Sequence, residues 1–244
     1  MVLAQFFSRG VLGCFSLVSF SFSINALADS CHPSPNPKLT QYIIGYGSLM
    51  QTESKNQTYP NTGRITPIIL SGFKRGWFAR GTPIGFSTTF LGVVEDMKSQ
   101  LNAVIFKVPS AAAVTHYDER EKVYCRIPVS SDAIEILNHK PKPQGQVWMY
   151  ISQMGSSAVN ASNHYPIVQS YVDIFLSGCL DIENQYHLKN FANNCIDSTS
   201  GWSKYWVNDR IYPRRPFVYQ PKAEQIDELL ERNLPHYFHS IKIE

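Results

Sequence analysis

A glycine-containing turn is the first segment whose residue types could carry chemistry. It follows the apolar run Tyr42–Ile44 and reads Gly45-Tyr46-Gly47-Ser48-Leu49. Glycine permits a sharp turn and a close approach of a ligand, and Ser48 could cap the segment that follows, leaving amide groups that point outward. Such a strand-to-helix turn suits an anion such as a carboxylate. The alternative is an ordinary tight turn. The lysine of a phosphate-binding loop is absent, which excludes that motif.

An acidic cluster at the end of a predicted helix is the second such feature. Ser110 is suited to cap a helix that runs through three alanines and continues to about Arg120. If that helix persists, Val114, Tyr117 and Glu121 share its apolar face, since they are three and four residues apart. Glu121 would then point into the core or into a cleft. Burial raises the pKa of a carboxyl group and suits it to act as a base near neutral pH.

The same charged run has a plainer interpretation. Runs of charge that follow a helix are commonly solvated, and residues 117–122 could be one of these. Asp118 and Glu119 fall on other faces of the predicted helix than Glu121, so each is free to be solvated or paired. The acidic cluster alone therefore leaves both a structural and a catalytic role open.

Taken together, the turn and the acidic helix end resemble the γ-glutamylcyclotransferase superfamily over residues 41–151. Glu121 matches the catalytic glutamate of that family's Leu-Asp-x-x-Glu-type element, with Tyr117 in place of the leucine. The segment Arg80-Gly81-Thr82-Pro83, which follows Phe73-Lys74-Arg75-Gly76-Trp77, is similar to ChaC-type glutathione-specific members. The helical last third resembles extended bacterial members.

The resemblance implies an enzyme that uses no cofactor and no metal. The free α-amino group of a γ-glutamyl donor attacks its own γ-carbonyl, which gives 5-oxoproline and releases an amine, an amino acid or a peptide. Holding the chain folded supplies much of the rate of such an intramolecular reaction, with effective molarities on the order of 10⁵ M and above. Glu121 would move the proton as base and then acid. The implied substrate-binding residues are Tyr46, Gly47, Ser48 and Leu49, with Arg80 and Tyr117 as candidate contacts of the substrate tail.

Other residues that could carry chemistry form weaker patterns. His236 and His239 are three residues apart, but no third metal ligand is suggested. Cys125 follows the acidic cluster on a strand-like segment, where a buried or disulfide-bonded cysteine is the commoner case. No Gly-x-Ser-x-Gly nucleophile motif is present. The aromatic, arginine-rich segment 201–219 suits an anion clamp and a packed aromatic cover held by arginine–carboxylate pairs equally well.

A second class of function fits the same residues. The fold without catalysis would give an exported binding protein that holds a small carboxylate ligand at the turn. If the protein is an enzyme, its leaving group stays open. Glutathione, a γ-glutamyl amino acid and a γ-glutamylamine differ only beyond the scissile bond.

Short strand-like segments dominate the first half of the chain and would position these residues. Each is rich in β-branched or aromatic residues and is bounded by Gly, Pro, Ser or Asn. Their density predicts a closed or strongly curled sheet. The predicted strands are 42–46, 64–70, 86–94, 101–108, 124–129 and 146–151.

The last third of the chain is predicted to be helical. Pro166 opens a helix in which Val168, Val172, Phe175 and Cys179 recur at intervals of four, three and four residues. A second helix is predicted at 186–194, and a third carries Ala223, Ile226, Leu229 and Leu230. We therefore expect an α+β fold, and the resemblance implies a curled mixed β-sheet or barrel with flanking helices and a helical C-terminal extension.

Residues 1–28 have the pattern of a secretory signal peptide. Arg9 precedes the apolar run Val11–Ile24, and Ala26-Leu27-Ala28 forms a cleavage site. We expect export to the periplasm or the exterior, with no stable membrane insertion after cleavage; the alternative is an uncleaved anchor. Export would let the four cysteines after the signal form disulfides in any of three pairings, of which Cys179–Cys195, the nearest in sequence, is favoured. The four are Cys31, Cys125, Cys179 and Cys195.

The composition and length set the remaining expectations. A net charge of +3 on 244 residues is too weak to indicate nucleic-acid binding, and no dense basic stripe occurs. We expect an extended lead-in over 29–40, one domain over 41–151, and an extension over 152–244 that packs on the same domain. The predicted protein is a monomer whose partner is a small γ-glutamyl molecule.

Overall fold

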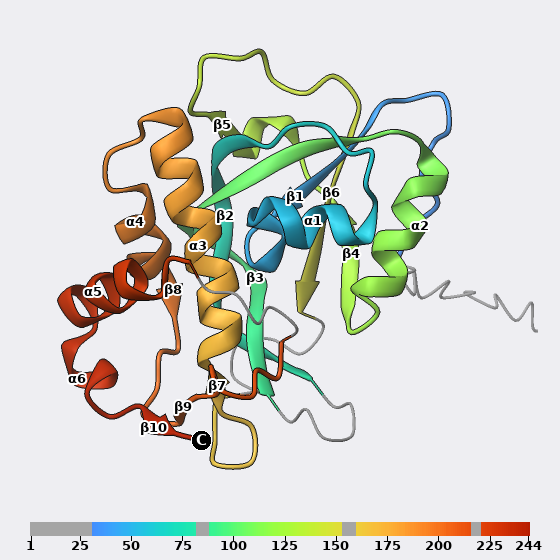
Figure 1. Cartoon of the computed structure of the whole chain (residues 1–244). Coiled ribbons are helices and arrows are strands. Elements are labelled where there is room, and N and C mark those ends of the chain that lie inside the picture. Colours follow the sequence, from blue (N-terminus) through green and yellow to red (C-terminus); the bar gives the residue numbers. More distant parts are fainter. Residues whose placement is uncertain (1–30, 82–87, 153–159, 216–220) are drawn as a thin grey trace, which may run out of the picture. The chain divides into compact units, whose positions relative to one another are not determined.

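A computed structural model describes residues 31–81, 88–152, 160–215 and 221–244 (Figure 1). The predicted signal peptide, and Thr82 and Pro83 of the ChaC-like segment, lie outside the described residues. None of the helices in the described ranges has both the length and the apolar character that crossing a membrane requires.

The main element is a mixed seven-stranded sheet with strand order β4-β6-β1-β3-β2-β5, to which β8 adds by pairing with β2. The pairs β1–β6 and β2–β8 are parallel, and the other pairs are antiparallel. The sheet curls but does not close, so it takes the curled rather than the barrel form of the two that the sequence indicates (Figure 1). The strands are β1 Gln41–Gly45, β2 Thr66–Gly81, β3 Thr88–Val108, β4 Tyr124–Pro128, β5 Ile134–Ile136, β6 Gln146–Ser152 and β8 Thr199–Ser200.

Two strands are longer than the sequence analysis predicts. The predicted strands 86–94 and 101–108 are one continuous strand, β3, and the strand predicted to end at residue 70 continues to Gly81 as β2. Residues 95–100 are mostly exposed, so neither face of the strand there packs against a core. The hydrophobic alternation therefore stops here, although β3 pairs with β2 on both sides of this stretch, with a shift in register between Ser71 and Phe73.

Helices cover one face of this sheet (Figure 1). The helix predicted from the alanines to Arg120 is confirmed as α2, and the Ser110 side chain caps it by accepting a hydrogen bond from the Ala113 amide at 3.2 Å. The helices are α1 Thr52–Thr58, α2 Ala111–Arg120, α3 Gln169–Tyr186, α4 Phe191–Asp197, α5 Ala223–Asn233 and α6 Pro235–Phe238, with 3-10 turns η1 Ser48–Met50 and η2 Ser131–Ala133.

Two helix predictions in the last third were wrong in their bounds. Helix α3 begins at Gln169 rather than at Pro166, because Ile167–Val168 form strand β7 and pair with β9 (Trp206–Asn208). Strand β10 (Lys242–Ile243) completes this small parallel sheet. The helix predicted at 186–194 begins later, at Phe191, and continues to Asp197 as α4, because α3 ends at Tyr186 and the left-handed residues His187 and Asn190 separate the two helices.

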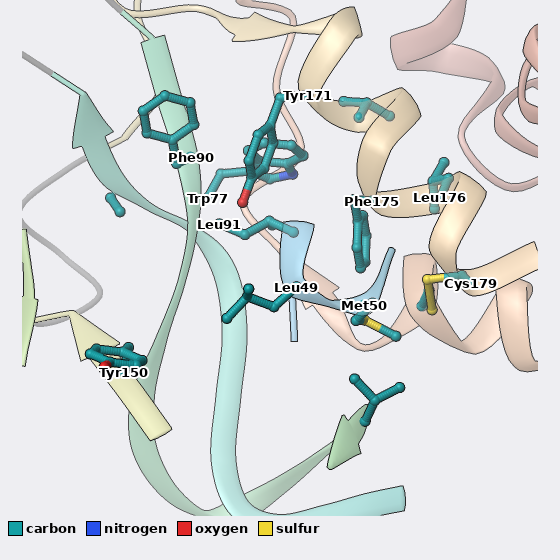
Figure 2. Close-up of a cluster of buried hydrophobic side chains, with 14 of the residues drawn as sticks. Leu49, Met50, Trp77, Phe90, Leu91, Tyr150, Tyr171, Phe175, Leu176 and Cys179 are labelled. Carbon is teal, nitrogen blue, oxygen red and sulfur yellow. A yellow bond between two sulfur atoms is a disulfide. The ribbon is translucent and has the colours of Figure 1, made fainter. Parts of the chain in front are cut away.

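The core between the sheet and the helices holds the glycine turn in place. Figure 2 shows Leu49 and Met50 of η1 beside Phe175, Leu176 and Cys179 of α3. The helix lies so close that a Cβ atom on Gly178 would be 2.8 Å from the backbone nitrogen of Gln51. The extension therefore supports the turn directly.

Among the residues that the structure describes, two disulfides are present, Cys31–Cys125 and Cys179–Cys195. The favoured pair Cys179–Cys195 is confirmed, and it joins α3 to α4. Both of its cysteines are fully buried, whereas Cys31 and Cys125 are partly exposed.

The double substitution C179A/C195A should lower the free energy of unfolding by about 3 kcal/mol, because a cross-link over a loop of this length restricts the unfolded chain by that amount. Denaturant titration of oxidised protein measures the difference. The same comparison in reducing agent should leave only the small cost of replacing cysteine by alanine. Equal stability of variant and wild type under oxidising conditions would contradict the expectation.

Candidate active site

A small pocket lies where the glycine turn meets β3, the end of α2, β4, β6 and α3. It contains about 310 Å³ of empty space, part of it open to solvent. A second hollow near η2 and β5 is larger, at about 720 Å³, but its lining does not include the turn or the acidic helix end. We therefore take the first as the candidate site. Its lining residues are Ile44, Gly45, Tyr46, Gly47, Ser48, Leu49, Leu91, Glu121, Tyr124, Tyr150 and Tyr171.

The turn needs glycine at two positions because neighbouring atoms approach its backbone closely. A Cβ atom on Gly45 would lie 2.8 Å from the Cβ of Leu49, and one on Gly47 would lie 2.9 Å from the hydroxyl oxygen of Tyr171. Real Cβ contacts are not this short, so any side chain there would displace the turn or the tyrosine. The glycines therefore let the chain fold back on itself under the Tyr171 ring.

Glu121 brings a carboxylate to this pocket. It is the C-cap of α2 rather than a residue within the helix, and its amide still donates to the Tyr117 carbonyl at 2.8 Å. Its side chain is only 15% exposed. Val114 and Tyr117 lie on the same side and are fully buried, as the spacing predicts.

Arg120 joins this glutamate to the turn. Its Nε atom lies 3.0 Å from Oε1 of Glu121, and its Nη2 donates to the Ser48 hydroxyl at 2.9 Å. It also donates to the carbonyl and hydroxyl of Ser54. Ser48 does not cap a helix as expected, because it is the first residue of η1 and Gly47 holds the N-cap position; its hydroxyl accepts from Arg120. The sequence analysis did not identify Arg120 as a site residue.

Burial raises the pKa of Glu121 above its ordinary value, while the cations Arg120 and Arg215 oppose that rise. The desolvation of the carboxylate outweighs both attractions. A carboxyl group with a raised pKa can accept a proton and return it within one reaction cycle near neutral pH. The site thus holds a group with the properties of a general acid–base catalyst.

Four tyrosines surround Glu121, namely Tyr46, Tyr124, Tyr150 and Tyr171. Burial raises the pKa of each tyrosine, and the negative charge of the Glu121 carboxylate raises it further. Their hydroxyls consequently remain protonated at neutral pH. Three donate within the protein: Tyr46 to the Tyr150 carbonyl at 2.6 Å, Tyr124 to the Leu91 carbonyl at 2.8 Å, and Tyr150 to Oδ1 of Asp118 at 2.7 Å. The walls of the pocket are therefore fixed in position.

The predicted site residues fall into two groups. Glu121 and the turn residues Tyr46 to Leu49 line one pocket. Arg80 and Tyr117 do not line it. Arg80 stacks over the Tyr165 ring at 4.0 Å, and Tyr117 is buried in the core beside Phe106.

The two acidic residues next to Glu121 in the sequence, Asp118 and Glu119, do not line the pocket. Asp118 accepts from Nε of Arg126 at 2.8 Å, whereas the Glu119 side chain is 80% exposed.

The tyrosines at 124, 150 and 171 line the pocket but were not singled out from the sequence. They come from three separate elements, so only the strand and helix packing brings them together.

The first part of segment 201–219 packs as an aromatic cover. Trp202 stacks on Trp206 and meets Trp77 edge-on. Arg210 pairs with Asp173 and Asp227, both at 2.7 Å. Within the described ranges, no group of three or more His, Cys, Asp or Glu side chains is placed to hold a metal ion.

The structure is an α+β fold on an open, curled sheet, and its pocket places one largely buried carboxylate beside a glycine turn. No protein-family model and no curated protein sequence matches the chain.

Several solved structures are similar in shape. A γ-glutamyl cyclotransferase has 14% identity and a TM-score of 0.49, covering 79% of this chain and 99% of its own. An uncharacterized protein from Homo sapiens has 15% identity and a TM-score of 0.48, covering 79% of this chain and 98% of its own. A γ-glutamyl cyclotransferase specific to glutathione, from yeast, has 14% identity and a TM-score of 0.39, covering 66% of this chain and 97% of its own.

Proposed function

We propose that the protein is a γ-glutamylcyclotransferase-type enzyme that converts the γ-glutamyl group of a small donor to 5-oxoproline. The observation that carries this proposal is the position of Glu121, a largely buried carboxylate that shares one pocket with the glycine turn. A buried acid beside a turn suited to a carboxylate is the arrangement that an internal aminolysis needs, because the reaction requires substrate folding and proton movement.

The proposed reaction uses Glu121 twice. Its carboxylate removes a proton from the α-ammonium group of the donor, and the resulting amine attacks the γ-carbonyl carbon to form the five-membered ring. The carbon–nitrogen bond to the leaving group then breaks, and the protonated Glu121 gives its proton to the departing nitrogen. The ring nitrogen passes its second proton to the released amine, which departs as an ammonium ion. Glu121 is then again a carboxylate, so no external acid, base or cofactor is consumed.

The turn supplies the rest of the proposed site. We assign the amides of Tyr46 to Leu49 to the glutamyl group, where N–H groups would stabilise a carboxylate or the developing oxyanion. Arg120 supports this assignment because it contacts both Ser48 and Glu121, which fixes the distance between turn and acid. The protonated tyrosines enclose the site without competing for the proton on Glu121.

A substrate panel tests the proposal. Purified protein is incubated with glutathione, two γ-glutamyl dipeptides and a γ-glutamylamine, and 5-oxoproline is measured. Product from at least one donor is expected. No product from any donor with folded protein would overturn the proposal, and calorimetric binding of an unchanged donor would then indicate a non-catalytic carboxylate-binding protein.

The pH profile of kcat/KM should show an acid limb with its midpoint above 4.5, the ordinary pKa of glutamate, because burial raises the pKa of Glu121. The base must be ionised, so the rate falls as pH drops through that raised pKa. The R120Q variant should move the midpoint to still higher pH, since Arg120 lowers the pKa of Glu121. A wild-type midpoint at or below 4.5 would contradict this account.

We also propose that the protein is exported after removal of residues 1–28, on the basis of their sequence pattern alone. Mass spectrometry of the mature protein from its native cells tests this. A mature chain beginning at Asp29 is expected, and an intact Met1 would instead indicate an anchored protein.

A further inference from the structure

The segment that leads to Arg215 is fixed to the start of α3 by buried polar groups. Asp209 accepts from both the amide and the hydroxyl of Ser170 at 2.7 Å, and from the Arg214 amide at 2.8 Å. The Ser170 hydroxyl oxygen accepts in turn from the Arg215 amide at 3.3 Å. Ser170 and Asp209 are almost completely buried. The backbone at Arg215 is thus held at a defined place beside α3.

A second attachment restrains the same segment. Arg210 donates to both carboxylate oxygens of Asp173 on α3, at 2.7 and 2.8 Å, and to both of Asp227 on α5. Bidentate arginine–carboxylate pairs fix geometry as well as charge. The chain just before Arg215 is therefore attached to α3 at two places, Ser170 and Asp173.

The Arg215 side chain faces the aromatic edge of the candidate site. Its guanidinium lies 4.1 Å from the centre of the Phe90 ring and 5.7 Å from that of Tyr171. Figure 2 shows these two rings side by side. Arg215 also interacts electrostatically with Glu121, although it is not among the residues that line the pocket. It thus lies next to the pocket, on the Phe90 and Tyr171 side.

In contrast to Arg75 and Arg120, which contact the glycine turn, Arg215 has unused donor capacity. Its buried Nε atom has no hydrogen-bond partner among the described residues. Arg75 and Arg120, in contrast, donate to several protein oxygens each. A buried donor without a partner costs free energy, and a guanidinium fork matches a carboxylate in geometry. Its surroundings are therefore suited to an anionic group that arrives with a ligand.

We propose that Arg215 binds a carboxylate on the leaving group, so that the enzyme prefers γ-glutamyl amino acids over γ-glutamylamines. This inference rests on the proposed function. Glu121 must reach the scissile nitrogen, so the glutamyl half of the donor extends from it toward the turn, and the leaving group extends away. A carboxylate close to that nitrogen would then meet the Arg215 guanidinium on the Phe90 and Tyr171 side.

Two donors that differ only in one carboxylate test this inference. γ-Glutamylalanine and γ-glutamylethylamine share the glutamyl group and the same carbon chain on the leaving nitrogen. Wild-type kcat/KM should be about 10- to 100-fold higher for γ-glutamylalanine, as a charge-assisted pair would give. The R215Q variant should lose most of this preference because its kcat/KM for γ-glutamylalanine falls. Its kcat/KM for γ-glutamylethylamine should change by less than about twofold.

Matched variants separate the possible results. R214Q removes the neighbouring arginine, whose side chain pairs with Glu244, and should leave both rates unchanged. R215K keeps the charge without the planar fork and should retain part of the preference, which gives a result even if R215Q does not fold. An equal fall for both donors, or no fall, in R215Q would overturn the role of Arg215 alone. No 5-oxoproline from either donor with wild-type protein would overturn the proposed function together with this assignment.

Discussion

The E121Q variant should form 5-oxoproline about 10²–10⁴ times more slowly than the wild-type protein, because glutamine has the shape of the glutamate but can neither accept nor return the proton. Donor binding should be largely retained, since the turn and the tyrosines are unchanged. The measurement is kcat for the best donor of the substrate panel, with binding followed by calorimetry.

A matched control is available next to Glu121. Glu119 lies in the last turn of α2, but its side chain is 80% exposed and does not line the pocket. The E119Q variant should therefore keep wild-type activity. If E121Q were as active as E119Q, Glu121 would not be the acid–base group.

The stability of E121Q provides a second control. The folded protein binds the Glu121 proton more tightly than the unfolded chain does, because burial raises the pKa of this group. The ionised carboxylate therefore costs folding free energy above the folded-state pKa, and this cost disappears as pH falls toward the ordinary value of about 4.5. We expect E121Q to be at least as stable as wild type at neutral pH, with the difference shrinking in acid. Lost activity therefore would not reflect unfolding.

The R75M variant should unfold with a free energy about 3–5 kcal/mol below that of wild type, the largest stability change that we expect from one substitution. Arg75 is fully buried, and no carboxylate neutralises it among the described residues. Its guanidinium instead donates to oxygens at 2.7–3.1 Å. These acceptors are the Thr199 and Ser198 hydroxyls, the Tyr46, Asn102 and Cys195 carbonyls, and the Asn102 side chain.

Methionine in place of Arg75 would fill the space but remove a donor from each of these oxygens. The Cys195 carbonyl and the Asn102 side chain would keep only their bonds from the Thr199 and Ser198 hydroxyls. Burial lowers the pKa of Arg75 to about 9, so the side chain remains protonated at neutral pH. Denaturant titration measures the loss, and K74M, one residue earlier on β2, should change stability by less than about 0.5 kcal/mol. Equal stability of R75M and K74M would show that the oxygens find other partners.

Arg75 also contacts the glycine turn of the proposed site. It contacts the Tyr46 carbonyl in the glycine turn and the Cys195 carbonyl in α4, so one cation connects the turn to the C-terminal helices. R75M should therefore lower activity as well as stability, whereas a surface variant such as K74M should affect neither.

The sequence predicts the local features of the site well, and the physical reason is that they depend on neighbours along the chain. The α2 helix is found from a cap at Ser110 and from alanine-rich sequence, and the buried face from the spacing of Val114 and Tyr117. The glycine turn is found from residue types alone. The expectation that the turn and Glu121 share one pocket came from the family resemblance. Residue types alone do not predict it.

Other features depend on contacts that the chain makes at long range. The stretch from 95 to 100 has no hydrophobic pattern, and its two ends, Glu95 and Gln100, are held by pairing with Phe73 and Ser71 of β2. Arg80 and Tyr117 do not line the pocket, whereas Tyr124, Tyr150 and Tyr171 do. No local signal distinguishes these tyrosines from the other tyrosines of the chain, and only the packing of strands and helix identifies them.

The partly exposed Cys31–Cys125 disulfide affects how glutathione can be assayed. Cys125 is four residues after Glu121, and glutathione is itself a reductant whose thiolate attacks accessible disulfides. Millimolar glutathione in an assay would therefore act on the protein as well as serve as a donor. An S-methylated analogue lacks the thiol and would report turnover alone.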